Sequence, residues 1–203
     1  MGLWSRVFAA TYDPLLARAE RRGIAAARHG LLAQVRGRVL EIGAGTGLNV
    51  EHYPEGSDVT YTEPDAHMAK RLRARGVAVV QAGAESLPFA DSSFDTVVST
   101  LVLCTVPDVS DALREVRRVL LPGGRLLFLE HVRAEPGSSL ERWQDRLHGP
   151  WHALAGGCNC NRDLLEALTA ESFELVELRR ELWRFMPPIV RPVLIGATAP
   201  AAA

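Results

Sequence analysis

The feature that most constrains this chain is a glycine-rich run, Glu41-Ile-Gly43-Ala-Gly45-Thr-Gly47, that directly follows a strand pattern over residues 38–42 and is expected to open a helix. Glycine lets the backbone turn sharply and approach a ligand without a Cβ in the way. A dinucleotide-binding turn needs a small residue where this chain has Leu48, because the helix that follows packs closely on the strand. Leu48 therefore argues against a diphosphate, whereas the acidic Glu41 suits a ligand whose nearby end carries an ammonium and a carboxylate. The glycines alone are equally compatible with a ligand-free strand-to-helix turn.

Strand and helix patterns alternate after this run. We expect strands over residues 59–62, 77–81, 96–100 and 125–131, with helices over 66–75 and 109–120. This alternation predicts a mostly parallel sheet with helices on both faces. Further patterns predict helices over 139–155 and 162–171 and strands over 174–181 and 193–198. The connection between the last two strands is too short for a parallel crossover, so we expect the last strand to be antiparallel.

A chain of 203 residues is long enough for one well-packed domain and short for two. We expect a single domain over residues 1–199. It divides into a helical preface or lid over 1–34, a cofactor-binding core over 35–133, and a substrate-side insertion with the carboxyl-terminal strands over 134–199. We expect breaks in the preface near Asp13-Pro14 and Gly23, and a disordered tail over 200–203.

Composition excludes several classes of function. The net charge of −1 gives no positive field for nucleic acid, and no segment reaches the ~20 apolar residues of a membrane-spanning helix. Cys104, Cys158 and Cys160 cannot all pair, and the pair Cys158-Asn-Cys160 lacks further ligands at zinc spacing. We therefore expect a cytoplasmic protein without a bound metal, whose apolar amino terminus over residues 1–8 makes at most a weak peripheral contact with membranes.

Two further loops follow predicted strands. Glu63 ends the second strand, 20 residues after Gly43, where an acidic side chain can accept hydrogen bonds from both hydroxyls of a ribose. Residues 83–89 follow the third strand, and the backbone of Ala84 and Glu85 can read the edge of an adenine. The alternatives are a solvated loop glutamate and ordinary loop packing.

Together these residues resemble the class I S-adenosylmethionine-dependent methyltransferases, over about residues 35–132. The resemblance implies an α/β, Rossmann-like fold with a mostly parallel seven-stranded sheet, an antiparallel last strand and helices on both faces. It implies S-adenosylmethionine as cofactor and S-adenosylhomocysteine as product, with the glycines around the methionine portion, Glu63 on the ribose and the loop from Gly83 at the adenine. The residues expected to bind the cofactor are Glu41, Gly43, Ala44, Gly45, Thr46, Gly47, Asn49, Glu63, Pro64, Met68, Gly83, Ala84, Glu85, Ser86, Thr100 and Leu101. One departure is Gly83, where many members carry an aspartate that contacts the adenine amine.

A narrower set of runs extends the resemblance to the carboxyl end. It comprises Gly45-Thr-Gly-Leu-Asn49 with Tyr53-Pro54, Thr100-Leu-Val-Leu-Cys104, Glu130-His131-Val132, Pro150-Trp151-His152, Gly157-Cys158-Asn159 and Val190-Arg191-Pro192 with Gly196. These runs resemble the methyltransferase-like family whose mammalian members methylate alkyl thiols. The resemblance implies a small thiol as methyl acceptor. Those mammalian members also have an amino-terminal membrane anchor, which we do not expect here.

Methyl transfer from a sulfonium is an in-line displacement, so the protein mainly positions the acceptor and excludes water. A thiol with a pKa near 8.5 is already partly ionised at pH 7 and needs no dedicated base. Candidate substrate-side residues are Tyr12, His131 and Trp151, although a histidine at a strand end and an aromatic residue on a helix are as often structural.

Four functions stay open at this point. The first is S-methylation of a small thiol, by a monomer or a homodimer, and the second is O- or C-methylation of a quinone, phenolic or lipid-like acceptor. A nicotinamide-dependent oxidoreductase is disfavoured by Leu48. The fourth is a non-catalytic module that binds S-adenosylmethionine without turnover.

Overall fold

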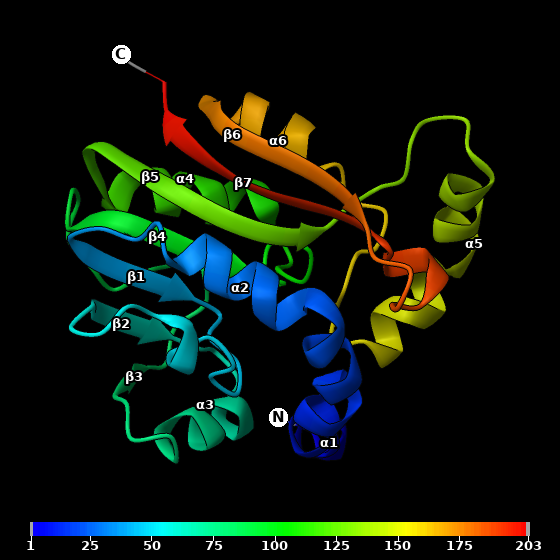
Figure 1. Cartoon of the computed structure of the whole chain (residues 1–203), viewed down its shortest axis with the longest axis horizontal. Helices are drawn as coiled ribbons and strands as arrows, with labels where there is room; N and C mark the ends of the chain where they lie inside the picture. Colours follow the sequence, from blue (N-terminus) through cyan, green and yellow to red (C-terminus); the bar gives the residue numbers. More distant parts are fainter. Residues whose placement is uncertain (1, 202–203) are drawn as a thin grey trace.

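The computed structural model describes residues 2–201, apart from the side chain of Leu3, and contains one seven-stranded sheet. The strand order is β3-β2-β1-β4-β5-β7-β6 (Figure 1). The strands are β1 (Arg38–Ile42), β2 (Asp58–Thr62), β3 (Val79–Val80), β4 (Phe94–Thr100), β5 (Leu120–His131), β6 (Phe173–Leu182) and β7 (Pro192–Pro200). The first five strands run parallel, and β7 is antiparallel to both of its neighbours. The expected mostly parallel sheet with an antiparallel last strand is confirmed.

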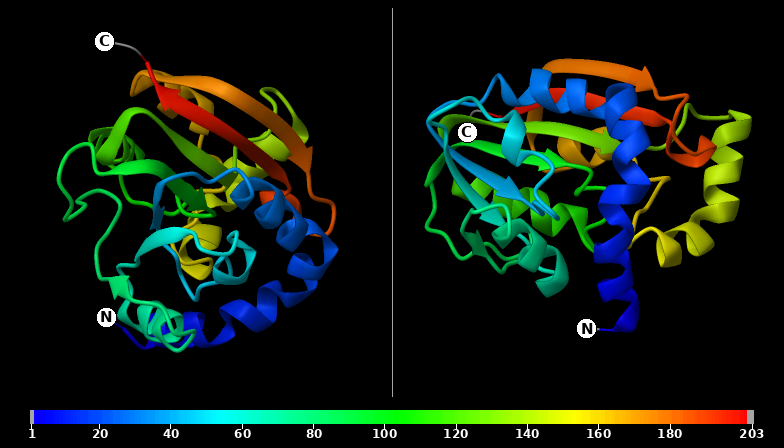
Figure 2. Two further views of the ribbon diagram at one scale, coloured as in Figure 1. Left: turned by 60° about the vertical axis from the view of Figure 1, so that its left-hand side comes forward. Right: turned by 60° about the horizontal axis from the view of Figure 1, so that its bottom comes forward.

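Helices cover both faces of the sheet (Figures 1 and 2). They are α1 (Leu3–Ala19), α2 (Ala25–Leu32), α3 (Ala66–Arg73), α4 (Val109–Val119), α5 (Ser139–Leu154) and α6 (Leu164–Ala170), with short turns η1 (Glu20–Ile24), η2 (Val50–His52) and η3 (Pro188–Val190). One face packs on α4 and α6 through residues such as Val97 and Phe128. The opposite face, with Val98 and Leu129, packs on α2 and η3. Alternate residues of each strand therefore serve two separate cores, as the pleat of a strand requires.

The amino-terminal helix α1 runs past the carboxyl ends of β1 and β2 and lies next to α3 (Figures 1 and 2). The expected break near Asp13-Pro14 is wrong, because α1 continues through Pro14. Proline removes only one backbone donor, and the Asp13 carboxylate is held by the Thr46 hydroxyl and, at 3.4 Å, by Arg75. The kink expected at Gly23 is present inside η1. Among the described helices, none is both long and apolar enough to cross a bilayer.

Two of the predicted strands have different bounds in the structure. The third strand was expected over 77–81, but β3 pairs with β2 only at Val79 and Val80. At the carboxyl end, β7 continues to Pro200, and the Ala201 N–H donates to the Ser172 carbonyl at 2.8 Å. The ordered strand thus extends past residue 199, while residues 202 and 203 of the expected tail lie outside the described chain.

Gly196 in β7 lies where three strands meet, and its lack of a side chain is a packing requirement. A Cβ there would lie 2.3 Å from the Glu177 carbonyl oxygen and 3.0 Å from Cζ of Phe128.

We expect Gly196→Ala to lower the free energy of unfolding by roughly 2–3 kcal/mol, because a backbone atom cannot move aside. Urea titration would measure the change. Gly30→Ala on α2, where a Cβ meets open space, is the control and should stabilise by up to ~1 kcal/mol. Equal stability of the two variants would contradict this account.

Candidate functional site

The glycine-rich turn connects β1 to η2 and has an unusual backbone. Gly43, Gly45 and Gly47 all have positive φ, at 57°, 59° and 86°, which is a conformation that side chains disfavour. A Cβ on Gly43 would lie 2.6 Å from Val102, and one on Gly47 would lie 2.7 Å from Leu72. In contrast, a Cβ on Gly45 would meet only a backbone oxygen at 4.0 Å. Gly45 is therefore the point at which a ligand can approach the turn.

The turn was expected to open a helix, and this expectation is wrong. Only the three-residue 3₁₀ turn η2 follows it. Pro54 explains the early end, because proline confines the residue before it to extended backbone, as seen for Tyr53 with ψ of 142°. The site therefore lacks the helix amino terminus with which dinucleotide-binding turns attract a diphosphate.

Glu63, at the carboxyl end of β2, joins the turn to the next loop. Glu63 as a whole is 6% exposed, and its carboxylate accepts hydrogen bonds from the N–H groups of Gly45 and Asp65, both at 2.8 Å. Burial raises the pKa of Glu63, and these two bonds oppose the rise. Because a carboxylate offers about four acceptor sites, each oxygen keeps one for an outside donor. Pro64 follows in the same loop, and Met68 is buried on α3.

The loop over residues 83–86 lies after β3 and places a second carboxylate at the site. The Ser86 N–H donates to the Gly83 carbonyl at 3.3 Å, and Ala84 is buried. Oε2 of Glu85 lies 2.9 Å from the point where a Cβ on Gly83 would be. Its other oxygen, Oε1, is buried and accepts no hydrogen bond from the described residues. The Glu85 carboxylate thus occupies the place of a side chain at position 83 and keeps an unused acceptor.

A buried polar network lies behind the glycine turn. Arg28 of α2 is 3% exposed and donates to Oδ1 of Asn49 at 2.8 Å and to the Thr100 hydroxyl at 2.9 Å. Asn49 in turn donates to Glu41 at 3.0 Å and to Thr100 at 2.8 Å. The remaining partner of the guanidinium is Glu20, at 3.2 Å. The network joins the end of β1, the glycine turn and the end of β4 to the amino-terminal helices.

Glu41 carries the most perturbed carboxylate of this network. It is 2% exposed, and its second oxygen accepts the Tyr53 hydroxyl at 2.6 Å. Burial raises the pKa of Glu41 to about 7, with the bonds from Tyr53 and Asn49 opposing the rise. Glu41 is therefore near half-ionised at neutral pH, where a nearby cation would favour its charged form.

The three candidate substrate-side residues divide into two groups. The Tyr12 ring lies 5.6 Å from Phe8, and its hydroxyl is close enough to Arg28 and Cys104 for their charges to act on its pKa, which burial raises. Trp151 of α5 packs with Cys104 and Cys158 in one apolar cluster. We call Tyr12, Cys104, Trp151 and Cys158 the acceptor wall. Leu101, with positive φ of 61°, follows Thr100 and joins the same cluster.

His131 is separate from the acceptor wall. It ends β5, is 7% exposed and faces the backbone of Val190 in η3. Burial lowers its pKa to about 4, the contact with Val190 acting in the opposite direction. The imidazole is thus neutral and weakly basic, which is typical of a packed histidine.

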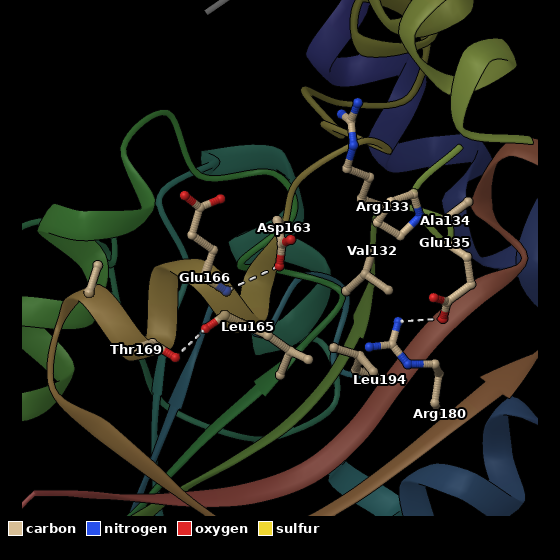
Figure 3. Close-up of a pocket in the computed structure, with 12 residues that line it drawn as sticks. Val132, Arg133, Ala134, Glu135, Asp163, Leu165, Glu166, Thr169, Arg180 and Leu194 are labelled. Atoms are coloured by element: carbon tan, nitrogen blue, oxygen red, sulfur yellow. Dashed lines mark hydrogen bonds and ion pairs between the residues drawn. The ribbon is translucent and has the colours of Figure 1, made fainter. Parts of the chain in front are cut away.

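A surface cavity of about 550 Å³ lies elsewhere, next to α6 and the loop after β5 (Figure 3). Four of its five charged side chains already have partners. Glu135 pairs with Arg180 at 3.3 Å, Arg133 pairs with Glu141 at 2.8 Å, and Asp163 caps α6 through the N–H of Glu166. The cavity shares no lining residue with the glycine turn or the acceptor wall, so we assign it no part in the chemistry.

Sequence reasoning found the loops of the site but missed the residues that hold them. Arg28 was not singled out. Tyr53 and Glu130 were named only within the runs that carry the narrower resemblance, with no role assigned to them. Glu130 is a fully buried carboxylate that accepts hydrogen bonds from Ser99, Val102, Leu103 and Cys104. The signal available in the sequence for Arg28 was a single arginine at the end of the run Ala25-Ala-Ala-Arg28. The predicted residues of the turn and of the loops after β2, β3 and β4 lie together at the carboxyl edge of the sheet. That they hold a ligand stays a prediction.

Comparisons with known proteins agree with this geometry. A family model described as a methyltransferase domain matches residues 40–128. Human (Homo sapiens) thiol S-methyltransferase TMT1A is 40% identical over 168 residues, which cover 78% of this chain and 68% of the relative. The ubiquinone/menaquinone biosynthesis C-methyltransferase UbiE of Pectobacterium carotovorum is 41% identical over 105 residues, covering 46% of this chain and 42% of the relative. A solved S-adenosylmethionine-dependent methyltransferase from Thermotoga maritima superposes with a TM-score of 0.70 at 24% identity, covering 96% and 95% of the two chains; this likeness concerns the fold.

The raised pKa of Glu41 gives a pH dependence of stability. A carboxyl whose pKa is higher in the folded protein stabilises the fold below its unfolded pKa of about 4.5, and this contribution is lost as the pH rises through 7. Relative to wild type, the always neutral Glu41→Gln should therefore gain up to about 3 kcal/mol between pH 4.5 and 8. Denaturant titrations across that range measure this, with the exposed Glu55→Gln as control. Parallel stability curves for wild type and Glu41→Gln would contradict the assignment.

Proposed function

This chain belongs to the S-adenosylmethionine-dependent methyltransferases, within the family that includes human thiol S-methyltransferase TMT1A, and we propose that it methylates the sulfur of a small thiol. S-adenosylmethionine is its cofactor and supplies a methyl group bound to a sulfonium. The acceptor is a small molecule. The substrate class and the roles of individual residues are our proposal.

The residues at the carboxyl edge fit this cofactor. The approach to Gly45 is open, and without a helix amino terminus it favours an amino-acid end over a diphosphate. Glu41, at the end of β1, supplies negative potential near the cofactor's ammonium. Asn49, which also donates to Thr100, holds that carboxylate in place. The free acceptor sites of Glu63 suit the two ribose hydroxyls.

The Glu85 side chain compensates for the missing aspartate at position 83. Its unpaired, buried oxygen is a site for the adenine amine, since a buried acceptor without a donor is costly and a bound N–H would satisfy it. The remaining cofactor residues, Ala44, Thr46, Pro64, Met68, Ala84, Ser86 and Leu101, shape the surface around these polar contacts.

The observation that carries the choice of a thiol is the absence of a competent base among the candidates. His131 has a pKa of about 4, so it is a weak base, and it faces η3. Burial raises the pKa of Tyr12, which keeps its hydroxyl protonated. A thiol already provides some thiolate at pH 7, whereas a phenol with a pKa near 10 depends more on proton removal. The sulfur and aromatic groups of the acceptor wall also suit a soft, apolar acceptor.

The protein contributes to the reaction by positioning and by excluding water. Alignment of the acceptor with the methyl group can supply ~7–11 kcal/mol of the barrier reduction. Helix α1 brings Tyr12 to the site and is held there through Asp13 on Thr46 and Arg75, and through Ser5 on Asp65. The apolar contact of the amino terminus with membranes stays a prediction; Trp4 and Val7 of α1 are 49% and 41% exposed.

A panel of acceptors tests the proposed substrate class. With cofactor carrying a labelled methyl group, we expect kcat/KM for alkyl thiols to exceed that for phenols and hydroquinones of similar size by at least about tenfold, because only the thiols ionise readily without a base. Transfer to phenols or quinols but not to thiols would replace our proposal with O- or C-methylation. Cofactor binding without transfer to any acceptor would indicate a non-catalytic module.

The proposed contact between Glu85 and the adenine amine is tested by binding measurements alone. We expect Glu85→Ala to weaken the affinity for S-adenosylhomocysteine by roughly tenfold, as loss of one hydrogen bond to a charged group does. An analogue whose adenine amine is replaced by hydrogen should bind wild type and variant equally. Calorimetry measures both, with Glu135→Ala, remote from the glycine turn, as the control. An equal loss for the two ligands would contradict a contact with the amine.

A further inference from the structure

Cys104 and Cys158 come from distant parts of the chain and meet in the acceptor wall. Cys104 lies in the turn after β4, and Cys158 follows α5. The Asn159 N–H donates to the Cys104 carbonyl at 2.7 Å, and the Asn159 side chain donates to the same oxygen at 3.2 Å. On the other side of Cys158, a Cβ on Gly157 would lie 3.4 Å from the Thr105 carbonyl. The two backbones thus run against each other, and the two thiols are close enough for each to act on the pKa of the other.

Both segments are fixed by buried groups. The Glu130 carboxylate accepts the Cys104 N–H at 3.2 Å and those of Val102 and Leu103 at 3.0 Å. On the opposite side, the fully buried Gln144 donates to the Cys160 carbonyl at 2.8 Å. A disulfide requires Cα atoms within about 7 Å, and the 2.7 Å hydrogen bond from the N–H of Asn159, the residue after Cys158, to the Cys104 carbonyl brings the two backbones to about that range. The bond can therefore form with little backbone movement.

The two thiols are chemically unequal. The contact with the Cys158 sulfur, together with burial, raises the pKa of the Cys104 thiol. The same contact, assisted by the Trp151 indole, lowers the pKa of Cys158. Cys158 is also the more exposed of the two, at 5% against 2%. A thiolate attacks oxidants far faster than a thiol, so Cys158 is the attacking sulfur and Cys104 the resolving one.

We propose that Cys104 and Cys158 form a modification site at which a peroxide produces an intramolecular disulfide that reversibly stops methyl transfer. The Cys158 sulfur attacks one peroxide oxygen and the O–O bond breaks. The other oxygen departs as water, and Cys158 becomes a sulfenic acid. The Cys104 sulfur then attacks the Cys158 sulfur and releases the second water. Two thiols and one hydrogen peroxide thus give one disulfide and two waters, with the thiols oxidised and the peroxide reduced.

The effect on turnover rests on the proposed function, whereas formation of the disulfide does not. Both sulfurs belong to the acceptor wall with Tyr12 and Trp151, so the S–S bond changes the surface against which an acceptor packs. It also covalently joins the turn after β4 to the segment after α5.

Cys160 provides a matched control in the same segment. Its Sγ points to the Gln144 carbonyl at 3.9 Å, and it is fully buried. Burial raises the pKa of Cys160 to about 11. We expect this thiol to react slowly and to form no disulfide.

The test treats the full-length protein with hydrogen peroxide, blocks remaining thiols and maps cross-linked peptides by mass spectrometry. Wild type and Cys160→Ser should give a peptide joining Cys104 to Cys158, and Cys104→Ser and Cys158→Ser should not. The melting temperature of oxidised wild type should rise by roughly 5–10 °C and return with dithiothreitol. Methyl transfer by wild type and by Cys160→Ser should fall at least about tenfold on oxidation and recover on reduction.

Two results would overturn the proposal: no peptide joining Cys104 to Cys158 in oxidised wild type, or the cross-link with unchanged turnover. The mapping uses wild type, so it does not depend on whether the serine variants fold. A cross-link that forms in a protein without transferase activity on any acceptor would support the modification site and refute the proposed function, so the two failures are distinguishable.

Discussion

The buried guanidinium of Arg28 is the interaction on which the arrangement of the site depends. Its partners come from three parts of the chain: Glu20 in η1, Asn49 after the glycine turn and Thr100 at the end of β4. A buried charge is tolerated only when its donors are satisfied, and loss of one partner of such a group typically costs 3–5 kcal/mol. The amino-terminal helices are thus fixed relative to the sheet edge by a set of bonds that all form together. Tyr12, and with it one side of the acceptor wall, depends on that attachment.

Glu130 has the corresponding role for the loop after β4. Its carboxylate binds the Ser99 hydroxyl and three consecutive backbone N–H groups, which otherwise would be buried without acceptors. Arg162 supports the same loop from the other direction, through the carbonyls of Leu103 and Val106. The charged side chains of Glu130 and Arg162 therefore replace regular secondary structure as the partners of this irregular backbone.

The sequence predicted the fold well because strands and helices repeat a local pattern, and because glycine, proline and acidic residues mark the turns. Glu63 illustrates this, since its place at the end of β2 follows from chain order alone. The prediction failed where distant contacts decide. Helix α1 continues through Pro14 because Asp13 is anchored on Thr46 and Arg75, which follow it in the chain by 33 and 62 positions. Similarly, Arg28 looks like any arginine on a helix until Asn49 and Thr100 are placed beside it. The acceptor residues are the least predictable, because Tyr12, Cys104 and Trp151 come from three unrelated segments.

The glycine-rich turn also shows what a sequence motif can and cannot report. Val102 and Leu72 occupy the space in front of Gly43 and Gly47, and only Gly45 borders open space. All three glycines are required by their positive φ, and two of them are in addition confined by neighbouring side chains of the protein itself. Smaller residues in place of Val102 and Leu72 would therefore not release the outer glycines, so a pattern search that demands all three reports the backbone of the turn and says little about the molecule that it binds.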